Sequence, residues 1–250
     1  MTGSRKVQGR TKLVQVLMPA LNEELSIKQL VTEYMSDPCV SEVVVIDNNS
    51  TDQTMQLAQE AGALVISCLL PGFGAAIKLG IENWLETSSG TALFIVESDG
   101  TFASNDLHKF YAYYDDADII TGSRTSKSLI WDGSYMPFWV KIGNWFVAKL
   151  TEFLYNGPSL TDIGCTAKFI KPGAISMAKV LELTDRSHFN EQFMVYLLES
   201  KKKVIEIPVN YKPRIGISKI TGGNTWTTLR LGIRMIVDVI LYRFFRHRIA

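Results

Sequence analysis

TALFIVESDGT, residues 91 to 101, runs an apolar segment directly into two carboxylates. Residues 91–96 predict a short buried strand, and Glu97, Asp99 and Gly100 follow it at once. Two carboxylates this close repel each other unless a cation lies between them and a partner. Asp-Gly pairs are also common in ordinary turns. Taken alone, the stretch is therefore compatible with a metal site or with a solvated turn.

The segments on either side of this strand alternate between apolar runs and helix-like runs. Strands that alternate with helices at this spacing indicate an α/β fold with a mostly parallel sheet covered by helices on both faces. Pro19 is expected to end the first strand. The predicted strands are 13–18, 42–46, 63–67, 91–96 and 117–121, and the predicted helices are 24–35, one ending at 59, 75–86 and 104–113.

Polar clusters follow three of the predicted strands: ALNEE at 20–24, DNNSTD at 47–52 and ESDGT at 97–101. In open parallel sheets, ligands bind beyond the carboxyl ends of the strands. The three loops are therefore expected to converge on one site. A hard cation such as Mg²⁺ or Mn²⁺ prefers such oxygen ligands and keeps positions open for phosphate oxygens.

Downstream of residue 121 the pattern is less regular, with one further strand expected at 203–209. Residues 137–155 are rich in aromatic side chains at helical spacing, and 229–245 form an apolar helix with one polar stripe. The second run is too short and too charged to span a bilayer, so it lies in a membrane interface or packs on the sheet. We divide the chain into a disordered basic tail (1–12), a catalytic domain (13–222) and an amphipathic C-terminal helix (223–250).

The composition excludes several classes of protein. The 250 residues are 46% hydrophobic with a net charge of +1, which supports a sizeable core and gives no bias toward nucleic acid. Three widely spaced cysteines suit a reducing cytosol and predict neither a disulfide framework nor a zinc site. The three histidines form no ligand pair along the sequence.

PGFGAAIKLG, residues 71–80, places two glycines before a helix that contains Lys78. Such a loop suits a pyrophosphate, but it lacks the third glycine of a dinucleotide fingerprint and the Gly-Lys-Ser/Thr of a Walker A loop. A dehydrogenase is therefore disfavoured. A nucleotidyltransferase usually carries a basic glycine-rich loop after its first strand, where this chain has ALNEE.

Eight motifs occur in the order found in family 2 glycosyltransferases of GT-A fold, and the chain resembles this family over residues 13–225. The downstream motifs are similar to those of the dolichol-phosphate mannose synthase branch. The motifs are PALNEE (19–24), VIDNNSTDQT (45–54), GFGAA (72–76), the acidic pair, GSR (122–124), TDIGC (161–165), NEQF (190–193) and RIGISK (214–219).

The resemblance implies a role for individual residues. Asp99 would be the metal ligand, Asp162 a general base or an electrostatic guide, and Arg124 a cation for the leaving phosphates. Arg214, Ser218 and Lys219 would bind phosphate or the acceptor. The residues that would bind the donor are Pro19, Leu21, Glu23, Asp47, Asn48, Gly72, Gly74, Lys78, Glu97, Ser98, Glu191 and Gln192.

Two positions depart from the family pattern. The family usually reads Asp-x-Asp where this chain has Glu97-Ser98-Asp99, so Glu97 is expected to serve the sugar. The family often has a second Asp where Asn48 stands, which puts base recognition in doubt.

The resemblance implies an inverting, Mg²⁺- or Mn²⁺-dependent transfer of a hexose from a GDP- or UDP-sugar. The expected acceptor is a phosphate-bearing lipid such as polyprenyl phosphate, met at the cytoplasmic membrane face. Alternatives are a soluble hydroxyl acceptor, with the apolar helices packed as core or as a homodimer interface, and a non-catalytic sugar-nucleotide binder.

Overall fold

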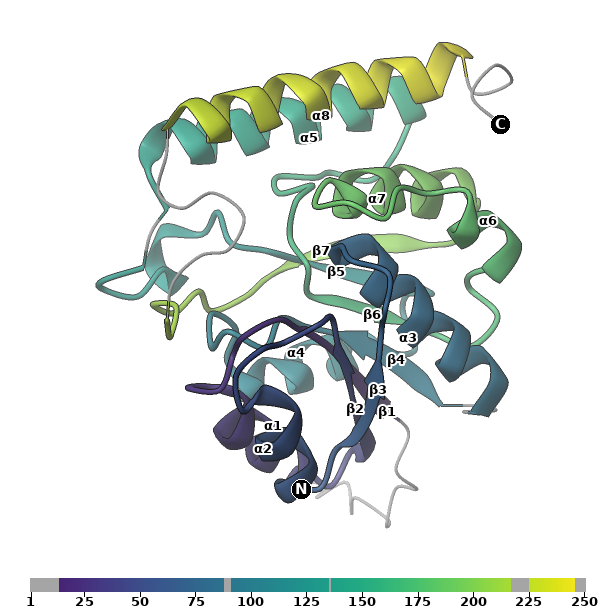
Figure 1. Ribbon diagram of the computed structural model, residues 1–250. Coiled ribbons are helices and arrows are strands. Elements are labelled where there is room, and N and C mark those ends of the chain that lie inside the picture. The colour runs from purple at the N-terminus through teal and green to yellow at the C-terminus, as the bar shows by residue number, and fades with distance from the viewer. Residues whose placement is uncertain (1–13, 88–90, 135, 217–224, 246–250) are drawn as a thin grey trace, which may run out of the picture.

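The computed structural model describes residues 14–87, 91–134, 136–216 and 225–245. At its centre is a seven-stranded sheet in the order β3-β2-β1-β4-β6-β5-β7 (Figure 1). β6 runs antiparallel to β4 and β5, and the other neighbours are parallel. The strands are β1 (Val14–Ala20), β2 (Val40–Asp47), β3 (Leu64–Ser67), β4 (Ala92–Ile95), β5 (Ile119–Ser123), β6 (Lys168–Ile170) and β7 (Val204–Pro208).

Helices cover both faces of the sheet, as the alternating pattern predicted. One face carries α1 (Ile27–Met35), α2 (Thr54–Glu60), the short 3₁₀ helix η1 (Ser104–Asp106) and α4 (Leu107–Ala112). The other carries α3 (Phe73–Thr87), α6 (Met177–Leu181) and α7 (Phe189–Glu199). A second 3₁₀ helix, η2 (Lys127–Leu129), follows β5.

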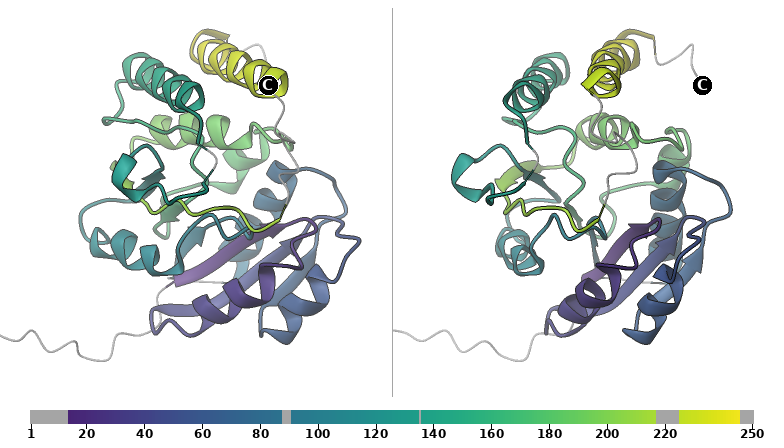
Figure 2. Two further views of the ribbon diagram at one scale, coloured as in Figure 1. Left: turned by 90° about the vertical axis from the view of Figure 1, so that its left-hand side faces the viewer. Right: turned by 60° about the vertical axis from the view of Figure 1, so that its left-hand side comes forward.

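α5 (Phe138–Tyr155) and α8 (Thr225–Phe245) lie side by side as an outer layer over α7 (Figures 1 and 2). Val239 of α8 is buried, and its carbonyl accepts a hydrogen bond of 2.9 Å from the Tyr155 hydroxyl. Among the described residues, no helix combines the length and hydropathy needed to cross a bilayer.

β1 shows why one strand builds two cores. Val16 and Met18 pack in the cluster under α1, whereas Leu17 between them packs with α3, because successive side chains point to opposite faces. All seven β1 residues are buried. Apart from Gln15, this is the apolar run expected of a central parallel strand.

Pro19 does not end the first strand, contrary to the prediction. β1 continues to Ala20 and pairs with β2 along its length, while its pairing with β4 stops at Leu17. Proline lacks a backbone N–H, and it is tolerated here because only one side of the strand is paired at that position.

Other boundaries also differ. The first helix begins at Ile27 instead of residue 24, because Glu23 and Glu24 form the turn in which the Glu23 carbonyl accepts the Ile27 amide at 2.9 Å. The C-terminal helix begins at Thr225 instead of 229. β6, α6 and α7 were not predicted as separate elements. The expected basic tail, 1–12, lies outside the described residues.

The antiparallel β6 determines where the site is built. Ile95 at the carboxyl end of β4 pairs with Lys168 at the start of β6. The loop that precedes β6, with TDIGC, must therefore lie at the same edge as the loop that follows β4. This single reversal brings residues 161–166 next to Glu97 and Asp99.

Gly80 on α3 makes a matched test of packing. A Cβ at Gly80 would lie 2.3 Å from Cδ1 of the buried Leu17, whereas one at the exposed Gly143 on α5 would meet nothing within 4 Å. Gly80→Ala is expected to lower the free energy of unfolding by about 1–3 kcal/mol through overpacking. Gly143→Ala is expected to raise it by about 0.5–1 kcal/mol through helix propensity. Urea unfolding measures both, and equal stability of the two variants would contradict the packing described for α3.

Candidate active site

The loops after β1, β2 and β4 meet at one edge of the sheet, as the sequence predicted. The Ser98 hydroxyl donates to the Pro19 carbonyl at 2.8 Å, and the Ser26 hydroxyl donates to the Ser98 carbonyl at 2.6 Å. The backbone amide of Asn48 donates to the Ala20 carbonyl at 2.8 Å. Ser98 is thus fixed by its backbone and side chain, and it carries its two acidic neighbours to this edge.

Asp99 is buried and held by both of its oxygens. Oδ1 accepts hydrogen bonds from the Thr101 amide at 2.9 Å and hydroxyl at 2.6 Å, and Oδ2 accepts one from Arg214 at 2.6 Å. The other guanidinium nitrogen of Arg214 donates to Glu23. Arg214 is thus the cation between two carboxylates of the edge, although the sequence predicted it on a phosphate.

Glu97 lies in a different environment. It accepts a hydrogen bond of 2.6 Å from the Thr166 hydroxyl, which in turn accepts one of 2.8 Å from Asn190 at the start of α7. Loss of water raises the pKa of Glu97 to about 7, and the neighbouring Asp99 carboxylate adds to the rise. The two acidic residues are therefore not equivalent: Asp99 contacts a cation, and Glu97 faces α7.

Besides the contacts of Arg214, the site contains a second ion pair, between Arg124 and Asp162. Arg124 contacts both oxygens of the buried Asp162, with Nε to Oδ2 at 2.7 Å and Nη2 to Oδ1 at 2.9 Å. The Arg124 amide adds a third bond at 3.0 Å, and Asn144 of α5 a fourth at 3.4 Å. Although burial opposes it, Arg124 holds the pKa of Asp162 below its usual value. This geometry suits an electrostatic guide better than a general base.

Glu191 has the opposite character. It is buried, and burial raises its pKa to about 7. Its Oε2 atom has no hydrogen-bond partner among the described residues. A Cβ at Gly164 would lie 3.6 Å from Arg124 Nη2 and 3.8 Å from Glu191 Oε1, so the missing side chain leaves space between these groups.

The end of β2 shows an unsatisfied acceptor. Asp47 is 2% exposed, and its Oδ2 accepts from the Ser50 amide at 3.2 Å. Its Oδ1 atom has no hydrogen-bond partner among the described residues. A buried carboxylate oxygen without a donor is a candidate for a ligand N–H or O–H, which fits the nucleoside role predicted for Asp47.

Asn48 and the two loop glycines contact the chain itself. Asn48 Nδ2 donates to the Leu70 carbonyl, and its Oδ1 accepts from the Gly72 amide, both at 2.8 Å. A Cβ at Gly72 would lie 2.1 Å from the Asp185 carbonyl, and one at Gly74 would lie 2.2 Å from the Thr184 carbonyl. The glycines therefore permit the close approach of the 184–185 backbone.

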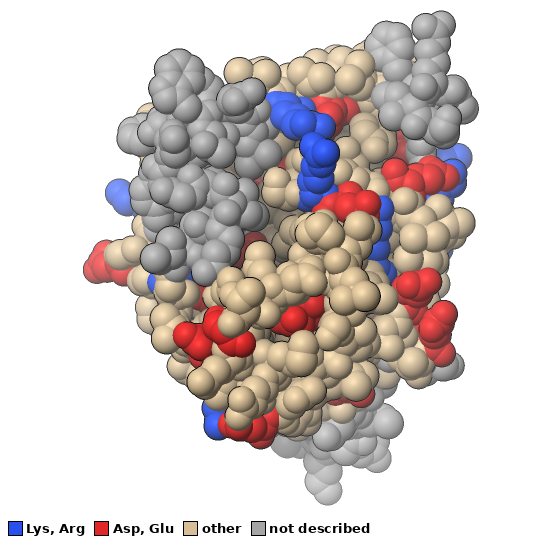
Figure 3. Space-filling model, in the orientation of Figure 1, with Lys and Arg blue, Asp and Glu red and all other residues tan. Residues whose placement is uncertain are grey.

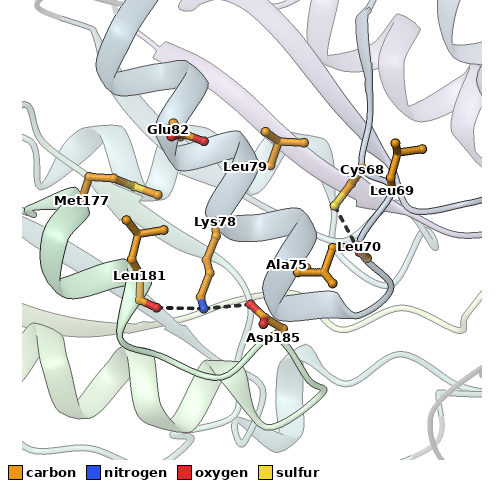
Figure 4. A pocket seen from close by; sticks show the side chains of 10 residues that line it. All are labelled: Cys68, Leu69, Leu70, Ala75, Lys78, Leu79, Glu82, Met177, Leu181 and Asp185. Carbon is orange, nitrogen blue, oxygen red and sulfur yellow. Dashed lines mark hydrogen bonds and ion pairs between the residues drawn. The ribbon is translucent and has the colours of Figure 1, made fainter. Parts of the chain in front are cut away.

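Lys78 also contacts that segment (Figure 4). Its buried ammonium donates to the carbonyls of Leu181 and Leu183 and forms an ion pair of 2.8 Å with Asp185. The groove drawn there is bordered by α3, α6 and the loop after β3, and its apolar lining is interrupted by Lys78, Glu82 and Asp185. Lys78 thus stabilises the carbonyl end of α6, and its contacts do not lead to Asp99.

The remaining predicted residues fall into two groups. Leu21 is 36% exposed next to Glu23, and Gln192 accepts a hydrogen bond from the Thr184 amide at 2.8 Å. Ser218 and Lys219 lie outside the described residues.

The sequence did not indicate several residues that complete the site. Thr101 could have been found from its place two residues after Asp99, and Asn190 from its place beside Glu191. Lys168 is buried in β6 with its ammonium on the Cys165 carbonyl, and Glu206 accepts the Thr161 and Asp162 amides at 2.8 and 3.0 Å. Nothing in the local sequence of these two distinguishes them from ordinary strand residues.

The edge is suited to a divalent metal. Asp99 and Glu23 present carboxylate oxygens, the ligands that Mg²⁺ and Mn²⁺ prefer, and the Arg214 guanidinium already lies between them. The arrangement therefore favours a positive charge at this place. The assignment of the ion to Asp99 stays a prediction.

A GT-A glycosyltransferase is the class of protein that this fold and this edge define. The family model "Glycosyl transferase family 2" matches residues 15–175, and the chain belongs to this family.

Relatives and solved structures agree with that membership. An uncharacterized glycosyltransferase of Mycobacterium tuberculosis is 28% identical over 227 residues, covering 90% of this chain and 95% of the relative. The low-salt glycan biosynthesis hexosyltransferase Agl6 of Haloferax volcanii is 29% identical over 241 residues, covering 92% of this chain and 55% of the relative. Glucosyl-3-phosphoglycerate synthase of M. tuberculosis, crystallised with Mn²⁺, UDP and phosphoglyceric acid, shares the fold at a TM-score of 0.65 and 15% identity, covering 93% and 78% of the two chains.

The raised pKa of Glu191 predicts a pH-dependent stability. A carboxylic acid whose pKa is higher in the folded chain contributes its full stabilisation at pH values below its pKa in the unfolded chain, which is near 4.5. This contribution is lost as the pH rises through the folded pKa of about 7. Because glutamine does not titrate, Glu191→Gln should abolish this decrease in the free energy of unfolding with rising pH. Relative to wild type, the variant should gain stability between pH 5 and 8, by about 3 kcal/mol at most.

Urea unfolding at both pH values measures this difference. Glu86→Gln, which replaces an exposed carboxylate on α3, is the control and should show no such trend. A Glu191→Gln variant whose relative stability is the same at pH 5 and pH 8 would refute a titrating, buried Glu191.

Proposed function

We propose that the protein is an inverting, Mg²⁺- or Mn²⁺-dependent hexosyltransferase that moves a sugar from a GDP- or UDP-hexose to a phosphate-bearing lipid such as polyprenyl phosphate. Asp47 and the β1 loop would hold the nucleoside, with Pro19, Leu21 and Glu23 at its border. Glu97 would face the sugar from beside α7. The role of Asn48 would be indirect, through the loop 68–72 that it fixes.

When bound, the metal would offset the negative charge that develops on the leaving diphosphate. Asp99 would hold that ion with the oxygen that now accepts from Arg214. Arg214, once displaced, would lie beside the diphosphate and could bind its oxygens as the sequence predicted. Arg124 is oriented by Asp162 and can add a fixed positive charge without moving.

The observation that carries the lipid acceptor is the two-sided character of α5. Asn144 reaches Asp162 at 3.4 Å from one side of the helix, while the neighbouring Trp145 and Phe146 are 50% and 53% exposed. We call the exposed apolar side chains of α5 and α8 the outer apolar face. It comprises Phe138, Ile142, Trp145, Phe146, Phe153, Ile233, Val237, Ile240 and Phe244.

This placement supports an acceptor with an anionic head and an apolar tail. The head would reach the edge at Arg124, and the tail would lie along α5 on the outer apolar face. Figure 3 shows basic and acidic side chains interspersed over the face of the molecule that it draws, which is not the extended basic surface that nucleic acid needs. A membrane surface is the partner that suits the exposed apolar side chains, and the cytoplasmic membrane face is the proposed location.

The state of Asp162 supports a phosphate acceptor as well. A phosphate is already an anionic nucleophile at neutral pH, so it needs orientation and no base. Asp162 accepts four hydrogen bonds and has a lowered pKa, which suits that task. A dolichyl-phosphate N-acetylglucosaminyltransferase of Methanococcus voltae is 22% identical over 218 residues, covering 79% of this chain and 85% of the relative.

Glu191 favours a second candidate, transfer to a hydroxyl of a soluble acceptor. A carboxylate with a pKa of about 7 and an unpartnered oxygen is suited to remove a hydroxyl proton. The outer apolar face would then be an interface between two copies of the chain. Product analysis with a short-chain prenyl phosphate and with a polyol phosphate as competing acceptors distinguishes the two candidates.

Asp99→Asn tests the metal site. We expect metal-dependent hydrolysis of the donor to fall by more than roughly 100-fold, because the neutral amide loses the charge that binds the ion, while circular dichroism stays that of wild type. Asp132→Asn, at an exposed position, should keep wild-type hydrolysis. Wild-type activity of Asp99→Asn would make the acidic pair a simple turn.

Phe146→Ser with Phe153→Ser tests the outer apolar face. Binding to anionic vesicles in a flotation assay should weaken by at least about 10-fold for each ring, because burying a phenyl side chain is worth about 1.5–3 kcal/mol. Donor hydrolysis should be unchanged. Leu181→Ser, which removes an apolar side chain on α6 that is 56% exposed, is the matched control. Absence of flotation by the wild-type protein, together with no prenyl-phosphate product, would overturn the lipid acceptor.

A further inference from the structure

Three metal-binding types of side chain meet at the other end of β2 from the active site. Asp37 and Cys39 precede the strand, and His108 lies in the first turn of α4. One ligand atom from each side chain lies within 4.8 Å of the other two. β2 has eight residues, so this cluster is separated from Asp47 by about 25 Å of extended chain.

The turn that carries two of these side chains is held by its own backbone. Asp37 Oδ1 accepts the Cys39 amide at 2.8 Å, and the Asp37 carbonyl accepts the Val40 amide at 3.0 Å. Pro38 between them fixes its own φ. The second carboxylate oxygen, Oδ2, is left to face α4 and lies 2.8 Å from His108 Nε2.

The surroundings are acidic, which favours a cation. Glu33 and Asp106 lie near this turn, and with Asp37 they add to the effect of burial in raising the pKa of the Tyr34 hydroxyl. Lys109 offsets part of this charge through an ion pair of 2.8 Å with Asp106. The side chain of His108 is 52% exposed and that of Asp37 is 12% exposed, so an ion from solvent can reach the cluster.

We propose that Asp37, Cys39 and His108 bind one zinc ion, or a related borderline divalent cation, at a site independent of the catalytic edge. One oxygen, one sulfur and one nitrogen form a donor set that zinc accepts, with a fourth position open to water. On binding, the S–H bond of Cys39 is replaced by a metal–sulfur bond, its proton is released to water, and the contact between Asp37 and His108 is replaced by bonds to the ion. The ion then links the turn before β2 to α4.

The spacing of cysteine and histidine along the sequence predicts no zinc site, and only the fold brings these three side chains together. His108 is separated from Cys39 by most of the first half of the chain, so no short spacing motif relates them. The α1–β2 turn and the start of α4 come together only because both helices cover the same face of the sheet.

Cobalt(II) is the probe that tests this site, because a cobalt–thiolate bond gives a charge-transfer absorption band in the near ultraviolet. The full chain is stripped with a chelator and titrated with Co²⁺, and Zn²⁺ is then added to displace it. We expect the band to saturate at one equivalent and to disappear with zinc. The Asp99→Asn variant should keep the band, which separates this site from the catalytic metal.

Variants assign the ligands. Cys39→Ser should abolish the band, whereas Cys68→Ser should keep it because that thiol lies after β3. His108→Gln, which replaces a side chain that is 52% exposed, should weaken Co²⁺ binding at least roughly tenfold. A wild-type protein without the band, a band that survives in Cys39→Ser, or unchanged affinity in His108→Gln would each overturn the proposal.

Discussion

The ion pair between Arg124 and Asp162 is the interaction on which the arrangement of the loops at the ends of β5 and β6 depends. It joins the end of β5 to the loop before β6, and α5 adds Asn144 to the same carboxylate. Glu206 of β7 binds the amides of Thr161 and Asp162 from the other side. Breaking such a buried pair by removing one partner costs about 3–5 kcal/mol. One helix, α5, the end of β5, the loop before β6 and Glu206 of β7 are therefore aligned around one carboxylate.

The carboxylates of the edge differ because their surroundings differ. Asp99 and Asp162 accept hydrogen bonds from hydroxyl, amide and guanidinium groups, and for Asp162 the Arg124 guanidinium holds the pKa below its usual value although burial opposes it. Glu97 and Glu191 are deprived of water without equal compensation, so the pKa of each rises to about 7. The same end of the sheet thus combines two carboxyl groups bound by hydrogen-bond donors with two buried carboxyl groups that can exchange protons near neutral pH.

Most of the first half of the fold could be predicted from the sequence. The strands 42–46 and 63–67 and the helix 75–86 are continuous patterns of one period, and the structure confirms them with boundary shifts of at most two residues. The short β6 could not be predicted, because three residues carry no period and one of them is a buried lysine.

Positions within the site were harder to predict than its place. Asp99 and Arg214 are 115 residues apart, and only the folded chain puts the guanidinium on the carboxylate. Lys78 was predicted beside the nucleotide because it follows a glycine-rich loop. The carbonyls of α6 bind it instead, and these come from an element that the sequence pattern did not indicate.

The bridge from Asp99 through Arg214 to Glu23 has a thermodynamic consequence. Because the chain supplies its own counter-ion, part of the negative charge of Asp99 and Glu23 is offset before any ligand arrives. In the proposed reaction a free divalent ion gains only the difference between its own attraction for these oxygens and that of the guanidinium it displaces. A nucleotide diphosphate would lower the free-energy cost of displacing Arg214, because its oxygens can accept hydrogen bonds from the displaced guanidinium. In that reaction metal and donor would bind with positive cooperativity, and the contacts of Arg214 would set the size of the coupling free energy.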